Sequence, residues 1–208
     1  MHSQAALLIV DVQNDFCPGG ALQISSGDRV IAPINRAVRR FTAAGLPVLA
    51  SRDWHPPVTA HFREYGGPWP VHCVQGTVGA CFHPDLQLPE GTVILSKGTV
   101  AELPGYSAFE AVDDTGKTLQ ELLREQETTQ LYVCGLATDY CVLHTTRDAL
   151  QRGFLITLLT DAVAGVDSTP GASAEAIAEM VQAGAGLATV DELCRCSRTS
   201  PSCWTVLH

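Results

Sequence analysis

The chain has 208 residues, of which 46% are apolar, and a chain of this length can bury one substantial core of ordinary domain size. Its 22 acidic residues outnumber its 13 basic ones, which gives a formal net charge of -9. That charge argues against nucleic acid or an anionic membrane as a partner, because both bind clustered Lys and Arg.

Six short runs rich in aliphatic residues recur along the chain, and such runs are typical of strands buried on both faces. In chain order they are residues 6–10, 47–51, 92–96, 131–136, 154–159 and 186–190. Helical patterns alternate with them at residues 28–45, 117–126, 140–153 and 173–184. This alternation predicts a doubly wound α/β fold, with a mainly parallel six-stranded sheet and helices on both faces.

Residues 55–90 interrupt this alternation, because they are rich in Pro and Gly and lack periodicity. A structureless insertion of that length within a compact domain is usually functional. We therefore expect part of the functional site to come from this segment.

The ends of the chain and its cysteines carry weaker signals. The N-terminal sequence, MHSQ, has no basic region before a short apolar core, and no window reaches the roughly 18 uninterrupted apolar residues of a spanning helix. We therefore expect no membrane partner and a cytoplasmic protein. The eight cysteines are scattered through a chain that does not need disulfides, so most should be reduced. Cys194, Cys196 and Cys203 crowd the polar C-terminal tail, to which we assign no role.

Reactive side chains follow four of the predicted strands. Asp11 follows the first strand, Asp53 and His55 the second, Lys97 the third, and Cys141 comes shortly after the fourth. In open α/β sheets, ligands bind beyond the carboxyl ends of the strands. A polar residue at one strand end is most often a solvated or helix-capping residue. Four strand ends together predict a catalytic site.

Cys141 lies in the sequence GLATDYCV, just inside a predicted helix. The positive end of the helix dipole favours a thiolate, so we expect a lowered pKa and a nucleophile at neutral pH. Lys97 would lower that pKa further, and Asp11 would take the proton that the thiol gives up. The alternative for Cys141 is a buried, inert cysteine, which is the role that we expect of Cys134 within the strand. We therefore predict a Cys-Asp-Lys triad.

Asp53 and His55 place two metal-type ligands on alternate residues of an extended segment, so that both side chains point to one side. Two ligands alone are a weak signal for a metal. Further ligand-type residues occur in the irregular segment, namely His61, Glu64, His72 and His83. A single His in a loop is more often a surface residue than a ligand, so residue chemistry leaves the remaining ligands open.

Separated blocks of the sequence resemble the nicotinamidases, which belong to the isochorismatase-like cysteine hydrolases. The blocks are DVQNDFCPGGAL at 11–22, SRDWHPP at 51–57, WPVHCVQGT at 69–77, FHPDL at 82–86, SKG at 96–98, YSAF at 106–109, GLATDYCV at 135–142 and TDA at 160–162. They occur in the family's order. The resemblance implies an isochorismatase-like hydrolase domain over residues 1–194 and a tail of unknown role over residues 195–208.

The resemblance implies a role for each residue at the predicted strand ends. It makes Cys141 the nucleophile, Asp11 the general acid and base, and Lys97 the third member of the triad. Its metal ligands are Asp53, His55 and His72. Some members of the family have a His and many a small hydroxyl residue at the position of His61, so a fourth ligand, His61 or Glu64, stays open. We expect one divalent metal, zinc, with iron or manganese as alternatives.

The resemblance also implies how a substrate is held. Phe16 and Trp69 would sandwich a pyridine ring, with Leu22 and Tyr106 beside it, although core packing is the alternative role of these four residues. In the family, a cis peptide precedes the Ala of the GLA block, here the bond from Leu136 to Ala137. The backbone N–H groups of Ala137 and Cys141 would form the oxyanion hole.

The expected reaction is hydrolysis of nicotinamide to nicotinic acid and ammonia through a thioester on Cys141, and of pyrazinamide to pyrazinoic acid, in NAD salvage. An isochorismatase or an N-carbamoyl amide hydrolase is the nearest rival, but such members lack this full set of metal ligands. A thiol redox or metal-storage protein is a rival of another class, and it would show several reactive thiols rather than one. Assembly into a homo-oligomer is left open.

Overall fold

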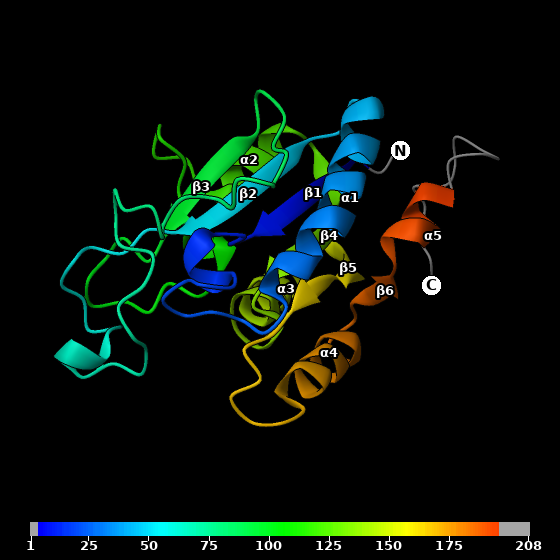
Figure 1. Ribbon diagram of the computed structural model, residues 1–208. Coiled ribbons are helices and arrows are strands. Elements are labelled where there is room, and N and C mark those ends of the chain that lie inside the picture. Colours follow the sequence, from blue (N-terminus) through cyan, green and yellow to red (C-terminus); the bar gives the residue numbers. More distant parts are fainter. Residues whose placement is uncertain (1–3, 196–208) are drawn as a thin grey trace.

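The computed structural model describes residues 4–195, and its centre is a single sheet. The strands are β1 (Gln4–Val10), β2 (Val48–Asp53), β3 (Val93–Lys97), β4 (Thr128–Leu136), β5 (Leu155–Ala164) and β6 (Gly186–Ala188). They lie in the order β3-β2-β1-β4-β5-β6, and every neighbouring pair is parallel (Figure 1). The predicted six-stranded α/β fold is confirmed, and its sheet is wholly parallel.

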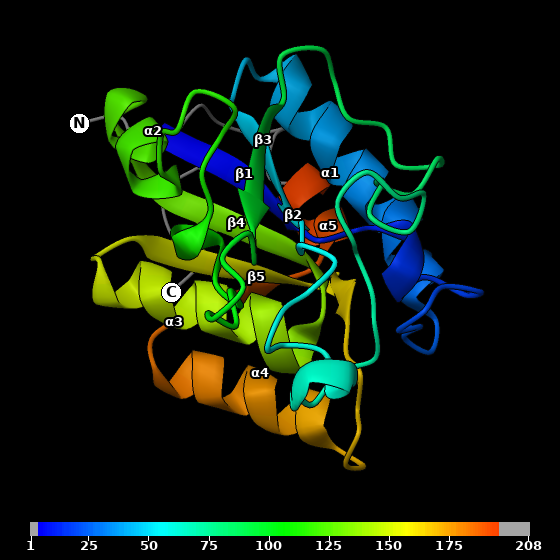
Figure 2. The ribbon, with the colours of Figure 1, turned by 90° about the vertical axis from the view of Figure 1, so that its left-hand side faces the viewer.

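Helices cover both faces of the sheet, as predicted (Figure 2). They are α1 (Ile31–Ala43), α2 (Leu119–Glu125), α3 (Leu143–Gln151), α4 (Ala172–Gln182) and α5 (Val190–Arg195). The buried side chains of α1 and α5 pack on one face, and those of α2, α3 and α4 pack on the other. Strands covered on both sides need apolar residues throughout, which explains the continuous apolar runs. No helix within residues 4–195 is long and apolar enough to span a bilayer.

The last two strands differ from their predicted bounds, and the helix predicted over 140–153 is a π-helical turn, Thr138–Val142, followed by α3. The last strand was predicted over 186–190, but β6 ends at Ala188 and Val190 begins α5. Thr189 and Glu192 bond reciprocally through side chain and backbone, which is a capping box that starts a helix. Strand β5 continues past residue 159 to Ala164, because its pairing with β4 shifts register and so accommodates the polar residues Thr160 and Asp161.

The order of the strands determines where a site can form. The chain passes from β1 outward through β2 and β3 on one side, and from β4 outward through β5 and β6 on the other. The carboxyl ends of β1 and β4 therefore flank the point at which the direction of winding reverses, which is where open sheets bind ligands. The irregular residues 55–90, cyan to green in Figure 1, extend beyond this edge.

The cysteines that the structure describes are all free thiols, as expected. Cys194 lies in α5 and is partly buried. The other two cysteines near the C-terminus, Cys196 and Cys203, lie outside the described residues together with the rest of residues 196–208.

Gly135 lies where β4 pairs with Val10 of β1, at a φ of 113°. A Cβ atom there would collide with the backbone of Val10, whereas one at Gly153, with a φ of 83°, would meet nothing within 4 Å. Gly153→Ala should therefore cost about 1 kcal/mol of unfolding free energy, and Gly135→Ala about 2 kcal/mol more from overpacking. Urea unfolding of both variants tests this, and equal losses would contradict it.

Candidate active site

The reactive residues predicted from the strand ends meet around one buried lysine. Lys97 ends β3, and its Nζ lies 2.8 Å from Asp11 Oδ2 and 3.3 Å from Cys141 Sγ. It also contacts the carboxylate of Asp53, which ends β2, and donates to the carbonyl of Gly105 at 3.1 Å. The predicted grouping of Cys141, Asp11 and Lys97 is therefore present in the structure.

Asp11 is oriented by its neighbours in the sheet. Ser51 Oγ donates to Asp11 Oδ1 at 2.7 Å, and the Asp11 N–H donates to the carbonyl of Ser51 at 3.1 Å. Asp11 has a φ of 50°, in the left-handed region that non-glycine residues seldom adopt. Backbone of this kind clusters at functional sites, where the surroundings hold it in place.

Burial and charge act in opposite directions on these groups. Burial raises the pKa of Asp11 and outweighs the attraction of Lys97. Burial also works to raise the pKa of Asp53, but Lys97 and His55 together hold that pKa below its ordinary value. Burial disfavours the charge of Lys97, yet the carboxylates of Asp11 and Asp53 raise its pKa well above its ordinary value. The surroundings therefore favour the ionised form of Asp53 more than that of Asp11.

The prediction of a lowered pKa for Cys141 is wrong. The residue lies in a π-helical turn, Thr138–Val142, ahead of α3, and it is buried. Burial raises the pKa of the Cys141 thiol well above its ordinary value, and the attraction of Lys97 is too weak to reverse this. Burial raises the pKa of Asp11 as well, and a carboxylate oxygen of Asp11 lies within 4.8 Å of the Cys141 sulfur.

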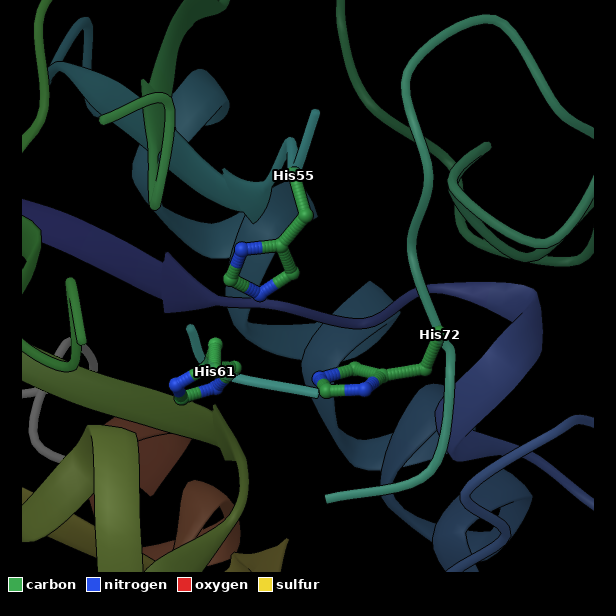
Figure 3. Close-up of side chains that lie close together, drawn as sticks. All are labelled: His55, His61 and His72. Atoms are coloured by element: carbon green, nitrogen blue, oxygen red, sulfur yellow. The ribbon is translucent and has the colours of Figure 1, made fainter. Parts of the chain in front are cut away.

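Three histidines form a second cluster beside Asp53. The rings of His55, His61 and His72 point toward one another in Figure 3, and their ligand atoms lie within 4.8 Å of one another. Asp53 Oδ2 lies 3.6 Å from His55 Nε2 and 3.8 Å from His72 Nε2. Of the candidates that the sequence left open, His61 joins this cluster. Glu64 is exposed on the short 3₁₀ turn Arg63–Tyr65 instead.

The donor atoms of this cluster fit a divalent metal. His55 Nδ1 donates to the carbonyl of Gly98 at 3.0 Å, and His72 Nδ1 donates to the carbonyl of Pro70 at 2.8 Å. These bonds fix the tautomers and leave a lone pair on each Nε2. His55 Nε2 is buried and has no hydrogen-bond partner among the described residues. Burial lowers the pKa of His61 to about 4, so its imidazole is neutral, the form that binds metal.

A narrow pocket connects the two clusters. It is lined by Phe16, Leu22, Asp53, His61, Trp69, His72, Tyr106, Ala137, Tyr140, Cys141 and Val166. All four predicted substrate-binding residues are therefore in its wall. Phe16 and Trp69 are buried, whereas Leu22 and Tyr106 are partly exposed at its rim. Its free volume is about 20 Å³, roughly the space that a single water molecule needs, so the walls fit closely together.

The turn that carries Cys141 has the backbone form that the resemblance implies. The peptide bond between Leu136 and Ala137 is cis. Ala137 and Cys141 both line the pocket. The structure therefore brings the two residues of the expected oxyanion hole to one side of the same pocket.

Two supporting residues escaped the sequence prediction. The amide of Gln13 donates to the carbonyl of Asp53 at 2.8 Å and accepts from the Asp53 N–H at 2.8 Å. Asp15 accepts from the N–H groups of Cys73 at 2.7 Å and Ala21 at 3.1 Å. The bonds of Gln13 hold the backbone of Asp53, a potential metal ligand. The bonds of Asp15 hold the backbone beside residues of the pocket wall. The signal available was a run of polar residues, QND, directly after a buried strand.

The isochorismatase domain family matches residues 5–192 of this chain. The chain belongs to this family. A nicotinamidase of Escherichia coli (strain K12) is 41% identical over 201 residues, which cover 89% of this chain and 94% of that protein.

Solved structures agree with the family assignment. A pyrazinamidase of Pyrococcus horikoshii in complex with zinc has a TM-score of 0.83 and 44% identity, over 89% of this chain and 99% of that one. PnC1 from L. infantum in complex with nicotinate has a TM-score of 0.79 and 35% identity, over 91% of this chain and 94% of that one. Membership of the family and this similarity make the chain an amidohydrolase with the isochorismatase-like fold.

Lys97→Met would leave Asp11 and Asp53 buried together without their shared cation. The folded-state pKa of Asp11 would then rise further above the unfolded value near 4, and that of Asp53 would rise from below it, because burial would no longer be opposed by Lys97. Stability is therefore kept at low pH and lost as pH rises. We expect a loss of about 3 kcal/mol or more at pH 8 and a smaller loss at pH 5. Urea unfolding in EDTA measures both.

Lys117→Met is the matched control, because Lys117 pairs with Glu125 on the surface at 2.7 Å. An exposed pair of this kind contributes little to stability, because solvent screens it. A Lys97→Met loss that is the same at both pH values, or no larger than that of Lys117→Met, would contradict the assigned role of the buried cation.

Proposed function

We propose that this amidohydrolase converts nicotinamide to nicotinic acid and ammonia, and pyrazinamide to pyrazinoic acid, by metal-dependent cysteine chemistry. The observation that carries this proposal is the contact of Lys97 with Cys141, Asp11 and Asp53 beside a narrow aromatic pocket. The similarity to the E. coli nicotinamidase and to the nicotinate complex supports the substrate class. The reaction would serve NAD salvage, and the cytoplasmic setting expected from the sequence belongs to the same proposal.

The substrate ring would lie in the pocket between Phe16 and Trp69. Their buried rings suit a flat aromatic guest, but the walls would have to move apart to admit it, because the free volume of about 20 Å³ is that of a single water molecule. Leu22 and Tyr106 would lie beside the guest. Cys141 lines the same pocket, so the carboxamide carbon of such a guest would face its sulfur. Fixing the ring in this way supplies the orientation that an attack on the amide requires.

Asp11 would take the thiol proton as Cys141 Sγ bonds to the amide carbon. The pKa values of both groups are raised by burial, which keeps the proton within the site instead of releasing it to solvent. The carbonyl oxygen gains the electron pair of the broken π bond, and the N–H groups of Ala137 and Cys141 would stabilise this oxyanion. Lys97, which stays charged, would favour the thiolate during the transfer.

The tetrahedral intermediate would then collapse to a thioester. As the C–N bond breaks, Asp11 gives its proton to the leaving nitrogen and ammonia departs. Asp11 next takes a proton from water as that water attacks the thioester carbon. The C–S bond breaks, nicotinic acid leaves, and the Cys141 sulfur regains a proton from Asp11. Each proton that Asp11 accepts is thus returned within the cycle.

Asp53, His55 and His72 would hold one divalent metal, with His61 as the fourth ligand. A set of one carboxylate and three imidazoles suits zinc, with iron or manganese as alternatives. The unpartnered His55 Nε2, the neutral imidazole of His61 and the zinc of the P. horikoshii complex support this assignment. When bound, the metal would offer the pyridine nitrogen of the substrate a coordination position and so fix the ring.

Cys141→Ala should abolish ammonia release from nicotinamide, a loss of about a thousandfold or more in kcat, because no other group can form the thioester. Cys81→Ala is the control, since Cys81 is an exposed free thiol, and it should keep wild-type turnover. Alkylation of one thiol per chain should remove the activity. That result would exclude a thiol redox or metal-storage protein, in which several thiols react. Near wild-type turnover by Cys141→Ala would refute the triad.

Benzamide tests the metal-anchored substrate, because it fits the aromatic slot but has no ring nitrogen. A site built for a polar partner rejects an analogue without it by about 10⁴ or more, so kcat/KM for benzamide should fall by that factor. His72→Ala should shrink this preference by harming nicotinamide most, and it should lower the metal content of the purified protein. His83→Ala, which changes a histidine outside the cluster, should do neither. Equal use of both amides by the wild type would defeat this part of the proposal.

A further inference from the structure

Helix α3 anchors the loop that carries Tyr106. Thr145 on α3 is fully buried, and its Oγ1 accepts from the backbone N–H of Ala108 at 2.9 Å. Ala108 opens a short 3₁₀ turn that directly follows Tyr106 and Ser107. The backbone beside Tyr106 is therefore attached to the helix that follows the turn of Cys141.

The residue before Thr145 contacts the ring of Tyr106. The imidazole of His144 stacks on that ring, with centroids 5.1 Å apart and planes 20° from parallel. The other ring neighbours of Tyr106 are more distant or more tilted, at 6.0 Å for Tyr140 and at 5.4 Å and 60° for His61. His144 is thus the ring that supports a face of Tyr106.

Tyr106 is in turn hydrogen-bonded to a wall of the pocket. Its hydroxyl oxygen accepts from Trp69 Nε1 at 2.8 Å. Trp69 is a buried wall of the pocket, and Tyr106 is part of the rim. His144 itself does not line the pocket, so it can affect a bound ring only through Tyr106 and Trp69. Small displacements matter here, because the pocket has little free volume and a misplacement of about 1 Å in such a site can be costly.

We propose that His144 is a positioning residue of this pocket, which holds Tyr106 by ring stacking and, through the hydroxyl of Tyr106, the indole of Trp69. This inference rests on the proposed function, since Trp69 and Tyr106 are its substrate-binding residues. Stacking needs a flat ring at position 144, and it does not need the ring nitrogens of histidine. A phenyl ring can therefore replace the imidazole.

The test compares His144→Ala with His144→Phe in the full-length protein, with nicotinamide as the substrate. His144→Ala should raise KM by about two- to tenfold, the factor expected for one ring pair, while kcat stays within about twofold of wild type. His144→Phe should restore the wild-type KM. An unchanged KM in His144→Ala, a loss confined to kcat, or a His144→Phe variant as impaired as His144→Ala would overturn the inference.

Two further variants separate positioning from a general effect on α3. Arg147→Ala removes an exposed side chain one turn along the helix, which pairs with Glu179 at 3.4 Å, and it should leave KM unchanged. In a Tyr106→Ala background, adding His144→Ala should have no further effect on KM, because the residue through which it acts is gone. A KM rise in Arg147→Ala, or additive effects in the double variant, would overturn the inference.

The wild-type assay keeps this test separate from the proposed function. If the wild type releases ammonia from nicotinamide and the His144 variants behave like it, the proposed function stands and the inference falls. If the wild type does not act on nicotinamide, the function falls, and a crystal structure of His144→Ala decides the inference. A Tyr106 ring displaced from its wild-type position supports the inference, and an unmoved ring overturns it.

Discussion

The burial of one positive charge, that of Lys97, organises this site. Lys97 is 1% exposed, and a buried ammonium group is tolerated only when it is paired and hydrogen-bonded. The sheet supplies its partners, because the parallel register of β2 and β3 places Asp53 beside Lys97 and the adjacent strand β1 brings Asp11. The parallel order of the strands is thus what gathers residues distant in sequence around the Cys141 thiol.

Lys97 lowers the pKa of both of its carboxylate partners, yet the net pKa shifts of the two carboxylates differ in direction. Asp53 has both Lys97 and the histidines beside it, and together they keep its pKa low against the effect of burial. Asp11 has Lys97 as its attractive neighbour, while burial and the charge of Asp53 raise its pKa. The difference assigns the proposed roles: an ionised carboxylate suits a metal ligand, and a carboxyl group with a raised pKa suits proton transfer. Asp53 belongs to both clusters and joins them.

The sequence predicted what depends on strand ends, and it missed what depends on tertiary packing. Apolar runs place Asp11, Asp53 and Lys97 at one edge once the sheet is known to be parallel. The pKa of Cys141 was mispredicted, because position in a turn can be deduced from the sequence but burial cannot. The contacts of Gln13 with Asp53 and of His144 with Tyr106 join residues far apart in the chain, which no local pattern reveals. Helix α5 is an exception among the missed features, because the capping box at its start is a local pattern that the sequence contains.

The irregular segment of residues 55–90 contributes to both the histidine cluster and the pocket. It supplies His61, Trp69 and His72 to the pocket. Backbone bonds attach it to the rest of the domain, from Ala60 N–H to the carbonyl of Ala101 and from His83 N–H to the carbonyl of Val12. Cys141 lines the same pocket, and burial is what raises the pKa values of Asp11 and Cys141. At an exposed strand edge, water would stabilise the charged forms of Asp11 and Cys141, and the pKa values of both groups would be lower. The insertion therefore forms part of the wall of the pocket into which the Cys141 thiol, itself outside the insertion, is placed by the turn after β4.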